Sequence, residues 1–174
     1  QHQGEVDMLE ETYLKIISAK TAELFAAATK VGAILSDMKS KEKEALEFYG
    51  RNLGLTFQIA DDTLDYNSEL KLFGKKIGQD FYEGKITLPI ILLFQRADDK
   101  EKERLKEIFS KNVRSKDDLE YSLSLIKRYE IIKACYQKAE HYINLASNSL
   151  SVFSDSEEKN ILENLTSFSL TRNF

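Results

Sequence analysis

The chain has 174 residues, of which 42% are hydrophobic and 31% charged, and its formal net charge is −4. This length suits one domain with a substantial core, and the charge offers no electrostatic basis for binding nucleic acid. No apolar run approaches the roughly 20 residues of a membrane-spanning helix, and no signal peptide is expected. The single cysteine, Cys135, cannot form an internal disulfide, which fits a reducing compartment.

The first predicted helix covers residues 6–35, with Tyr13 and Leu24 on its buried face. Lys20 falls on the same face, where an unpaired ammonium group is costly. We interpret it either as a lysine at the helix edge whose head group reaches solvent, or as a cation directed into an internal polar cavity. Small side chains over residues 21–28 let a neighbouring helix approach closely.

A second helix, predicted over residues 42–66, carries a run of acidic side chains. Gln58, Asp61, Asp62 and Asp65 stand at i, i+3, i+4 and i+7, which places them on one face. Three carboxylates within two turns repel each other. A hard cation such as Mg²⁺, which prefers oxygen ligands and bridges to substrate phosphates, would compensate them. The alternative is a solvated acidic face. The predicted apolar face consists of Leu53, Phe57, Ala60 and Leu64.

Glycines mark the next two features. Gly50 and Gly54, four residues apart, offer either a close-packing face or neutral surface positions. Residues 67–84 then form the irregular region of the chain. Its glycines and lysines make either an anion-binding flap or a flexible surface loop, and the sequence leaves both open. These residues are Gly74, Gly78 and Gly84, with Lys75, Lys76 and Lys85 in or beside the region.

The remaining segments also predict helices. Residues 87–94 are interpreted as a buried helix, because Pro89 suits a first turn and no second strand is available for pairing. Capping-box spacing at residues 98–101 starts a further helix. A long helix is predicted over residues 116–150, and residues 154–157 cap a last one. One all-α domain is therefore expected.

Four sequence blocks occur in a recognisable order. They are Lys20-Thr21-Ala22, Phe57-Gln58-x-x-Asp61-Asp62-x-x-Asp65-Tyr66, Gly74-Lys75-x-x-Gly78-x-Asp80 and Gly84-Lys85-x-Thr87-x-Pro89. Together they closely resemble the trans-polyprenyl diphosphate synthases, above all the long-chain octaprenyl and decaprenyl type that makes quinone side chains. The resemblance covers essentially the whole chain and implies the all-α isoprenoid synthase helical bundle. The family's first aspartate-rich motif is absent, so residues 1–174 are expected to be the C-terminal part of that single domain.

The resemblance implies a Mg²⁺-dependent prenyltransferase that condenses an allylic diphosphate with isopentenyl diphosphate. Lysines would contact the diphosphate, the threonine and glutamine would present oxygen dipoles to the allylic cation, and the phenylalanine would line the isoprene pocket. The implied catalytic residues are Lys20, Thr21 and Gln58; the substrate-binding residues are Phe57, Lys75 and Lys85; the metal-site residues are Asp61, Asp62 and Asp65. Among the three acids, Asp62 is expected to orient a lysine or a metal-bound water rather than to bind the metal directly.

The resemblance further implies a cytoplasmic homodimer, with at most peripheral membrane contact through its lipid product. Because the first motif is absent, the 174 residues alone are expected not to turn over. Three alternatives remain: a catalytically silent partner subunit, a terpene cyclase of the same fold, or a purely structural helical module. The intact acids argue against the silent subunit, and the Lys75 and Lys85 blocks look more like chain elongation than cyclisation.

Overall fold

A computed structural model describes residues 10–67 and 77–171, which form helices and turns with no strand among them. The predicted all-α class is therefore confirmed. In chain order the elements are α1 (Glu10–Ile17), the π-helical turn η1 (Ser18–Ala22), α2 (Glu23–Leu35), α3 (Ser40–Leu64), α4 (Gln79–Glu83), α5 (Leu88–Arg96), α6 (Asp99–Ser110), α7 (Lys116–Arg128), α8 (Ile131–Ser149), the 3₁₀ turn η3 (Leu150–Val152) and α9 (Glu157–Thr171).

The chain divides into two compact units. Of the described residues, 10–13, 61–67 and 77–136 form one, which we call the DDxxD unit, and residues 14–60 and 137–171 form the other, the bundle unit. No helix in the described part of the chain combines the length and apolar character that a membrane crossing needs.

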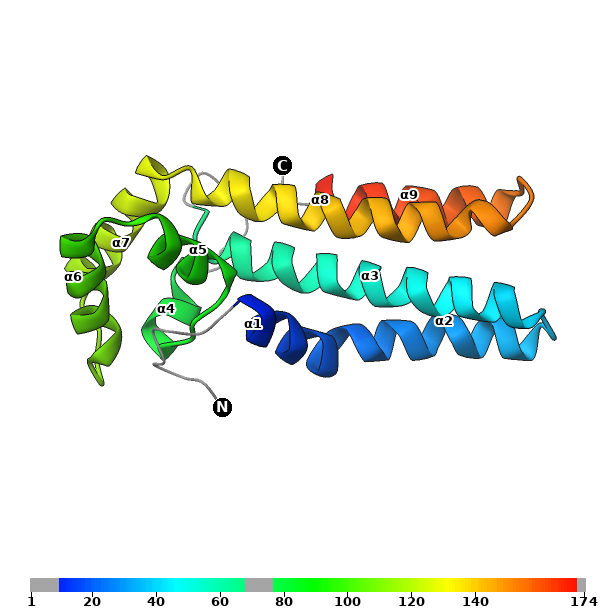
Figure 1. The fold of residues 1–174 in the computed structure, drawn as a ribbon, viewed down its shortest axis with the longest axis horizontal. Coiled ribbons are helices and arrows are strands. Elements are labelled where there is room, and N and C mark those ends of the chain that lie inside the picture. The colour runs from blue at the N-terminus through cyan, green and yellow to red at the C-terminus, as the bar shows by residue number, and fades with distance from the viewer. Residues whose placement is uncertain (1–9, 68–76, 172–174) are drawn as a thin grey trace. The chain divides into compact units, whose positions relative to one another are not determined.

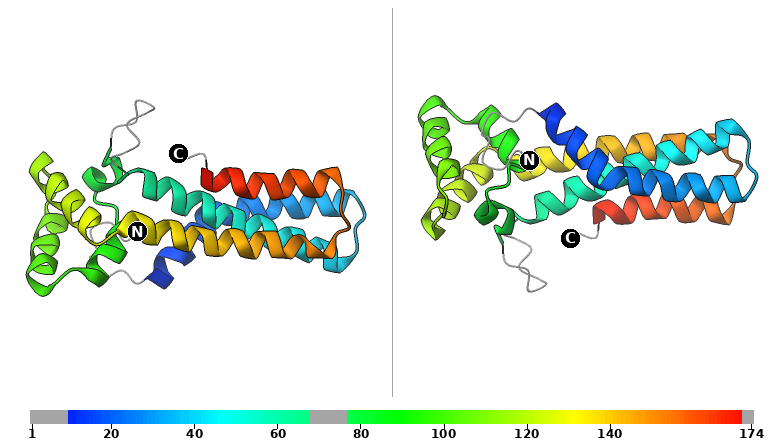
Figure 2. Two further views of the ribbon diagram at one scale, coloured as in Figure 1. Left: turned by 90° about the horizontal axis from the view of Figure 1, so that it is seen from above. Right: turned by 90° about the horizontal axis from the view of Figure 1, so that it is seen from below.

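In the bundle unit, α2, α3, α8 and α9 run side by side (Figures 1 and 2). The hydroxyls of α3 tie it to its neighbours. The Thr56 hydroxyl, which lies 3.0 Å from the Asn52 carbonyl of its own helix, also lies 3.3 Å from the Ala139 carbonyl on α8. Tyr49 donates to the Leu162 carbonyl on α9 at 2.8 Å. The core of this unit consists of Ala33, Leu46, Tyr49, Leu53, Ile143, Ala146 and Leu150, all buried.

The contact between α3 and the α2 segment is close enough to require glycine. A Cβ on Gly54 would lie 2.6 Å from the Cα of Ala22, and a Cβ on Gly50 would collide with the Thr29 hydroxyl. Thr29 in turn donates to the Leu46 carbonyl at 2.6 Å. The close-packing interpretation of the two glycines is therefore confirmed.

The DDxxD unit contains α4, α5, α6 and α7. Pro89 stands in the first turn of α5, where its missing N–H costs no hydrogen bond, and the helix is buried as predicted. Asp98 starts α6 with the predicted capping box, in which its side chain and that of Glu101 each accept from the other's backbone N–H. Phe81 of α4 packs edge-on against Phe109 of α6, with ring centroids 5.4 Å apart.

Two helix predictions are wrong in detail. The predicted helix over residues 6–35 is interrupted by η1, and the extra residue of a π-turn rotates the following faces. As a result Leu24 is 73% exposed, and Lys20 is exposed as well. The predicted helix over residues 116–150 ends at Arg128 and restarts at Ile131, because Glu130 adopts a left-handed conformation with φ of 50°.

Candidate functional site

The three acids of the DDxxD motif lie in and just after the last turn of α3, and the structure gives them different surroundings. Asp62 is 5% exposed and accepts a hydrogen bond of 2.7 Å from the hydroxyl of Tyr13 on α1. Burial, and next the charge of Asp62, raise the pKa of Tyr13 well above its ordinary value. The phenol therefore stays protonated and can act as a permanent donor to the carboxylate.

Asp65 directs both of its carboxylate oxygens to the start of α4. One oxygen accepts from the backbone N–H of Gln79 at 3.0 Å, and the other from that of Asp80 at 2.9 Å. Its own carbonyl accepts from the N–H of Gly78 at 2.9 Å. An anion in this position satisfies two of the N–H groups that a helix start leaves without partners. Asp65 thus fixes α4 to the end of α3.

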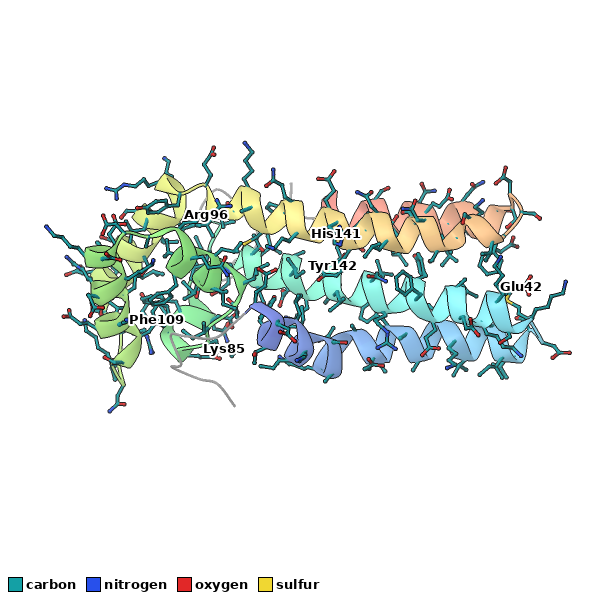
Figure 3. The ribbon with its side chains drawn as sticks, viewed as in Figure 1. Glu42, Lys85, Arg96, Phe109, His141 and Tyr142 are labelled. Carbon is teal, nitrogen blue, oxygen red and sulfur yellow. The ribbon has the colours of Figure 1, made fainter. Side chains whose placement is uncertain are left out.

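Lys85 follows α4 directly, after a turn made by Gly84 with φ of 73°. Its backbone N–H donates to the Asp80 carbonyl at 3.0 Å, and its ammonium lies 2.9 Å from Asp80 and 2.6 Å from Glu83. The hydrogen bond to Glu83, then that to Asp80, raises the pKa of Lys85. Figure 3 labels Lys85 at this turn. The ammonium is therefore held beside α4 as a lasting positive charge.

Negative charge accumulates around Tyr66, which is fully buried just after α3. Burial raises its pKa first, and the charges of Asp65, Asp80 and Asp62 add to the rise. Asp61 belongs to the same stretch and is half-buried, so it is the most accessible acid of the motif. An added cation would offset this accumulation of carboxylates.

The carboxylates of the DDxxD motif fit Mg²⁺ even though they do not form a closed cluster of protein ligands in the described residues. Within residues 10–67 and 77–171, no three His, Cys, Asp or Glu side chains gather into a metal-binding cluster. Mg²⁺ does not need one, because it commonly keeps several waters and binds through one or two carboxylates together with substrate phosphates. Asp61 is half-buried, whereas Asp62 and Asp65 are buried, so Asp61 is the acid of the motif most open to an added ion.

The bundle unit carries the other predicted residues. The hydroxyl of Thr21, in η1, donates to the side-chain oxygen of Gln58 on α3 at 2.8 Å. Phe57 packs against Phe25 with ring centroids 5.5 Å apart. Thr21 in the π-turn thus lies against Gln58, while the neighbouring Lys20 is exposed.

Two outcomes differ from the sequence-based picture. Lys75, predicted to bind substrate, lies outside the described residues, as do Gly74 and Lys76. Tyr13 was assigned only to the buried face of its helix, yet it is the partner of Asp62. No spacing rule connects residues 49 positions apart, so only the fold could reveal that pair.

Comparison with known proteins identifies the family of the chain. The family model for polyprenyl synthetase matches residues 1–126, well over half of the chain. The chain belongs to the polyprenyl synthetase family. The resemblance carried by the four sequence blocks is thus confirmed for the family.

Curated relatives of the chain are roughly twice as long. The short chain isoprenyl diphosphate synthase of Methanothermobacter thermautotrophicus is 37% identical over 169 residues, covering 96% of this chain and 51% of that protein. The all-trans-nonaprenyl-diphosphate synthase (geranyl-diphosphate specific) of Rhodobacter capsulatus is 33% identical over 172 residues, with coverages of 99% and 52%. The chain therefore spans about half the length of these curated relatives.

Solved structures confirm the isoprenoid synthase fold. The polyprenyl synthase of Caulobacter crescentus, solved with calcium and isoprenyl diphosphate, superposes with a TM-score of 0.93 at 36% identity. The match covers 100% of this chain and 53% of that chain. The decaprenyl diphosphate synthase of Rhodobacter capsulatus gives 0.92 at 32% identity, with coverages of 99% and 53%.

Proposed function

We propose that this polyprenyl synthetase serves prenyl chain elongation, in which an allylic diphosphate ionises, isopentenyl diphosphate attacks the resulting carbon and a proton is lost. The observation that carries the proposal is the arrangement of Asp61, Asp65 and Lys85. The acids stand in and just after the last turn of α3, and Asp65 anchors the short helix α4, which ends two residues before the lysine. Carboxylates and an ammonium therefore stand on elements that are fixed to each other, which supports binding of a cation together with its diphosphate.

Departure of diphosphate builds negative charge on its oxygens, and preorganised positive charge lowers that barrier. Mg²⁺, when bound, would supply Lewis-acid neutralisation of the leaving group. Asp61 would hold the ion directly. Asp62, oriented by Tyr13, would orient a lysine or a metal-bound water. Asp65 would complete the motif from the position that its two amide contacts fix.

The lysines would bind the diphosphate as point charges. Lys85 would exchange its contacts with Asp80 and Glu83 for diphosphate oxygens, and Lys20 and Lys75 would contribute in the same way. Thr21 and Gln58 would present the oxygens of their hydrogen-bonded pair to the allylic cation. Phe57 would line the path of the incoming isoprene unit.

The isoprenyl diphosphate bound by the Caulobacter crescentus relative supports this substrate class. On the four sequence blocks we assign a long-chain product for quinone side chains, made by a cytoplasmic homodimer. The relatives carry both short chain and nonaprenyl names, so product length is the finest part of the proposal.

Binding of inorganic diphosphate with Mg²⁺ tests the proposal on the 174-residue chain. We expect calorimetric binding that requires Mg²⁺ and that weakens at least about tenfold, or about 1.4 kcal/mol, in Asp61→Asn. Asp117→Asn is the matched control, because Asp117 is an exposed acid of another Asp-Asp pair in the same unit. The two variants should unfold at the same temperature as the unmodified protein.

Two outcomes would overturn the proposal. Absence of any Mg²⁺-dependent diphosphate binding would favour a purely structural helical module. Equal binding by the unmodified protein and Asp61→Asn would remove Asp61 from the site. We further expect binding without turnover of allylic and isopentenyl diphosphates, because the 174 residues contain a single DDxxD motif. Measured prenyl transfer by this chain would contradict that expectation.

A further inference from the structure

A buried arginine lies in the DDxxD unit outside all the residues assigned above. Arg114 is 7% exposed and stands between α6 and α7, directly before Ser115, which caps α7. Burying a guanidinium is costly unless its N–H groups find acceptors. The acceptors nearest the Arg114 guanidinium are backbone carbonyls at the ends of two helices.

The guanidinium of Arg114 serves the C-terminal ends of two helices. One terminal nitrogen donates to the carbonyl of Phe109, in the last turn of α6, at 2.7 Å. The other lies 3.5 Å from the carbonyl of Tyr82, in the last turn of α4. Carbonyls in the last turn of a helix have no partner within it and carry partial negative charge. A guanidinium cation between the two helix ends donates hydrogen bonds to these carbonyls and offsets their partial negative charge.

The same guanidinium also packs against the turn that precedes Lys85. Gly84 adopts φ of 73°, and a Cβ there would lie 2.8 Å from both terminal nitrogens of Arg114. On its other side, the guanidinium carbon lies 5.3 Å from the ring centroid of Phe109, which Figure 3 labels on α6. Glycine is thus required at position 84 for two reasons, the backbone conformation and the space that Arg114 occupies.

We propose that Arg114 is a positioning residue that holds the turn from Tyr82 to Lys85, and so places the Lys85 ammonium for diphosphate. The inference rests on the proposed function in assigning the diphosphate to Lys85. Asp65 secures the start of α4 and Arg114 secures its end, each with the charge that suits that end of the helix. The turn that carries Lys85 is therefore fixed from both sides.

A lysine cannot replace this arginine. An ammonium is a single point charge, whereas the planar guanidinium reaches two carbonyls and stacks on an aromatic ring at once. Arg114→Lys should therefore keep the charge but release the turn. The matched control is Arg104→Lys, because Arg104 stacks over the Tyr121 ring at 4.0 Å in the same unit but touches neither α4 nor its turn in the described contacts.

The experiment records the side-chain NMR signal of Lys85, assigned by its loss in Lys85→Arg, and the calorimetric affinity for Mg²⁺ with inorganic diphosphate. In Arg114→Lys we expect the Lys85 signal to move toward that of an exposed lysine and the affinity to fall about tenfold. Arg104→Lys should change neither. An unmoved Lys85 signal in folded Arg114→Lys would overturn the inference.

A second pair of variants covers the case in which Arg114→Lys does not fold. Gly84→Ala keeps Arg114 but displaces its guanidinium from the turn, so the Lys85 signal should move as well. Gly32→Ala on α2 is the control, because nothing lies within 4 Å of the position of its Cβ, and it should leave the Lys85 signal in place. An unmoved Lys85 signal in folded Gly84→Ala would contradict the role of Arg114. If the unmodified chain does not bind diphosphate, the proposed function fails while the NMR signal still decides this inference.

Discussion

A hydrogen bond from a tyrosine hydroxyl distinguishes Asp62 from the other acids of the motif. The donor is the buried hydroxyl of Tyr13, at 2.7 Å from the carboxylate. A buried carboxylate that loses such a donor keeps its desolvation penalty without compensation. Tyr13 therefore both stabilises the folded chain and fixes the direction in which Asp62 points.

Replacing Tyr13 with phenylalanine removes only the hydroxyl. We expect the free energy of unfolding to fall by about 1–3 kcal/mol, the usual cost of leaving a buried charged acceptor without its partner. Urea unfolding measures this change. The exposed Tyr82 provides the control, since Tyr82→Phe removes a hydroxyl from the same unit without stranding a buried group. Equal effects of the two substitutions would show that Asp62 does not depend on Tyr13.

Spacing predicted three acids on one helix face but gave no way to rank them. The ranking depends on Tyr13, far earlier in the chain, and on backbone amides of Gln79 and Asp80, which follow an irregular region. Sequence motifs record which side chains are present. They do not record how deeply the fold buries each carboxylate, and that difference in exposure is what distinguishes Asp61.

Helix prediction succeeded where local chemistry decides and failed where it does not. Pro89 and the capping box at Asp98 act through neighbouring residues, and both helix starts appear as predicted. The π-turn η1 and the break at Glu130 interrupt segments whose apolar pattern continues through them. The π-turn contacts α3 through Thr21 and Gln58, and periodicity alone does not contain such a long-range contact.

The π-turn η1 can pack this closely against α3 because Gly54 has no side chain. There the added methyl of an alanine would stand 2.6 Å from the Cα of Ala22, backbone that cannot move aside alone. The displacement would also separate Thr21 from Gln58, whose hydrogen bond is 2.8 Å long. The geometry of the Thr21–Gln58 pair therefore depends on Gly54, which has no side chain.

Gly54→Ala should destabilise the protein even though alanine favours helix more than glycine does. We expect a net loss of about 1–3 kcal/mol, because overpacking of a tight contact exceeds the gain in helix propensity of about 1 kcal/mol. Gly32 on α2 supplies the control, since no atom lies within 4 Å of the position of its Cβ. Gly32→Ala should raise the thermal unfolding temperature while Gly54→Ala lowers it. A stabilising Gly54→Ala would contradict the close contact.

Buried tyrosines link the stability of both units to alkaline pH. Burial raises the pKa of Tyr49 in the bundle unit to about 12. In the DDxxD unit burial is also the main cause that raises the pKa values of Tyr13 and Tyr66 well above the ordinary value. Each phenol is thus easier to ionise in the unfolded chain, where its pKa is about 10, than in the folded protein.

The sign of the resulting pH dependence follows from proton binding. Above about pH 10 the unfolded chain releases these protons while the folded chain keeps them, so the free energy of unfolding falls as pH rises. Each protected tyrosine contributes at most about 1.4 kcal/mol per pH unit until its folded pKa is reached.

Tyr49→Phe should cost about 1 kcal/mol at neutral pH, because its hydrogen bond to the Leu162 carbonyl is lost. It should also flatten the alkaline slope, measured by urea unfolding at increasing pH with tyrosinate absorbance recorded in parallel. Tyr82→Phe, at an exposed position, should leave the slope unchanged. A slope that Tyr49→Phe does not alter would show that the ionisation of Tyr49 is not coupled to the folding of the bundle unit.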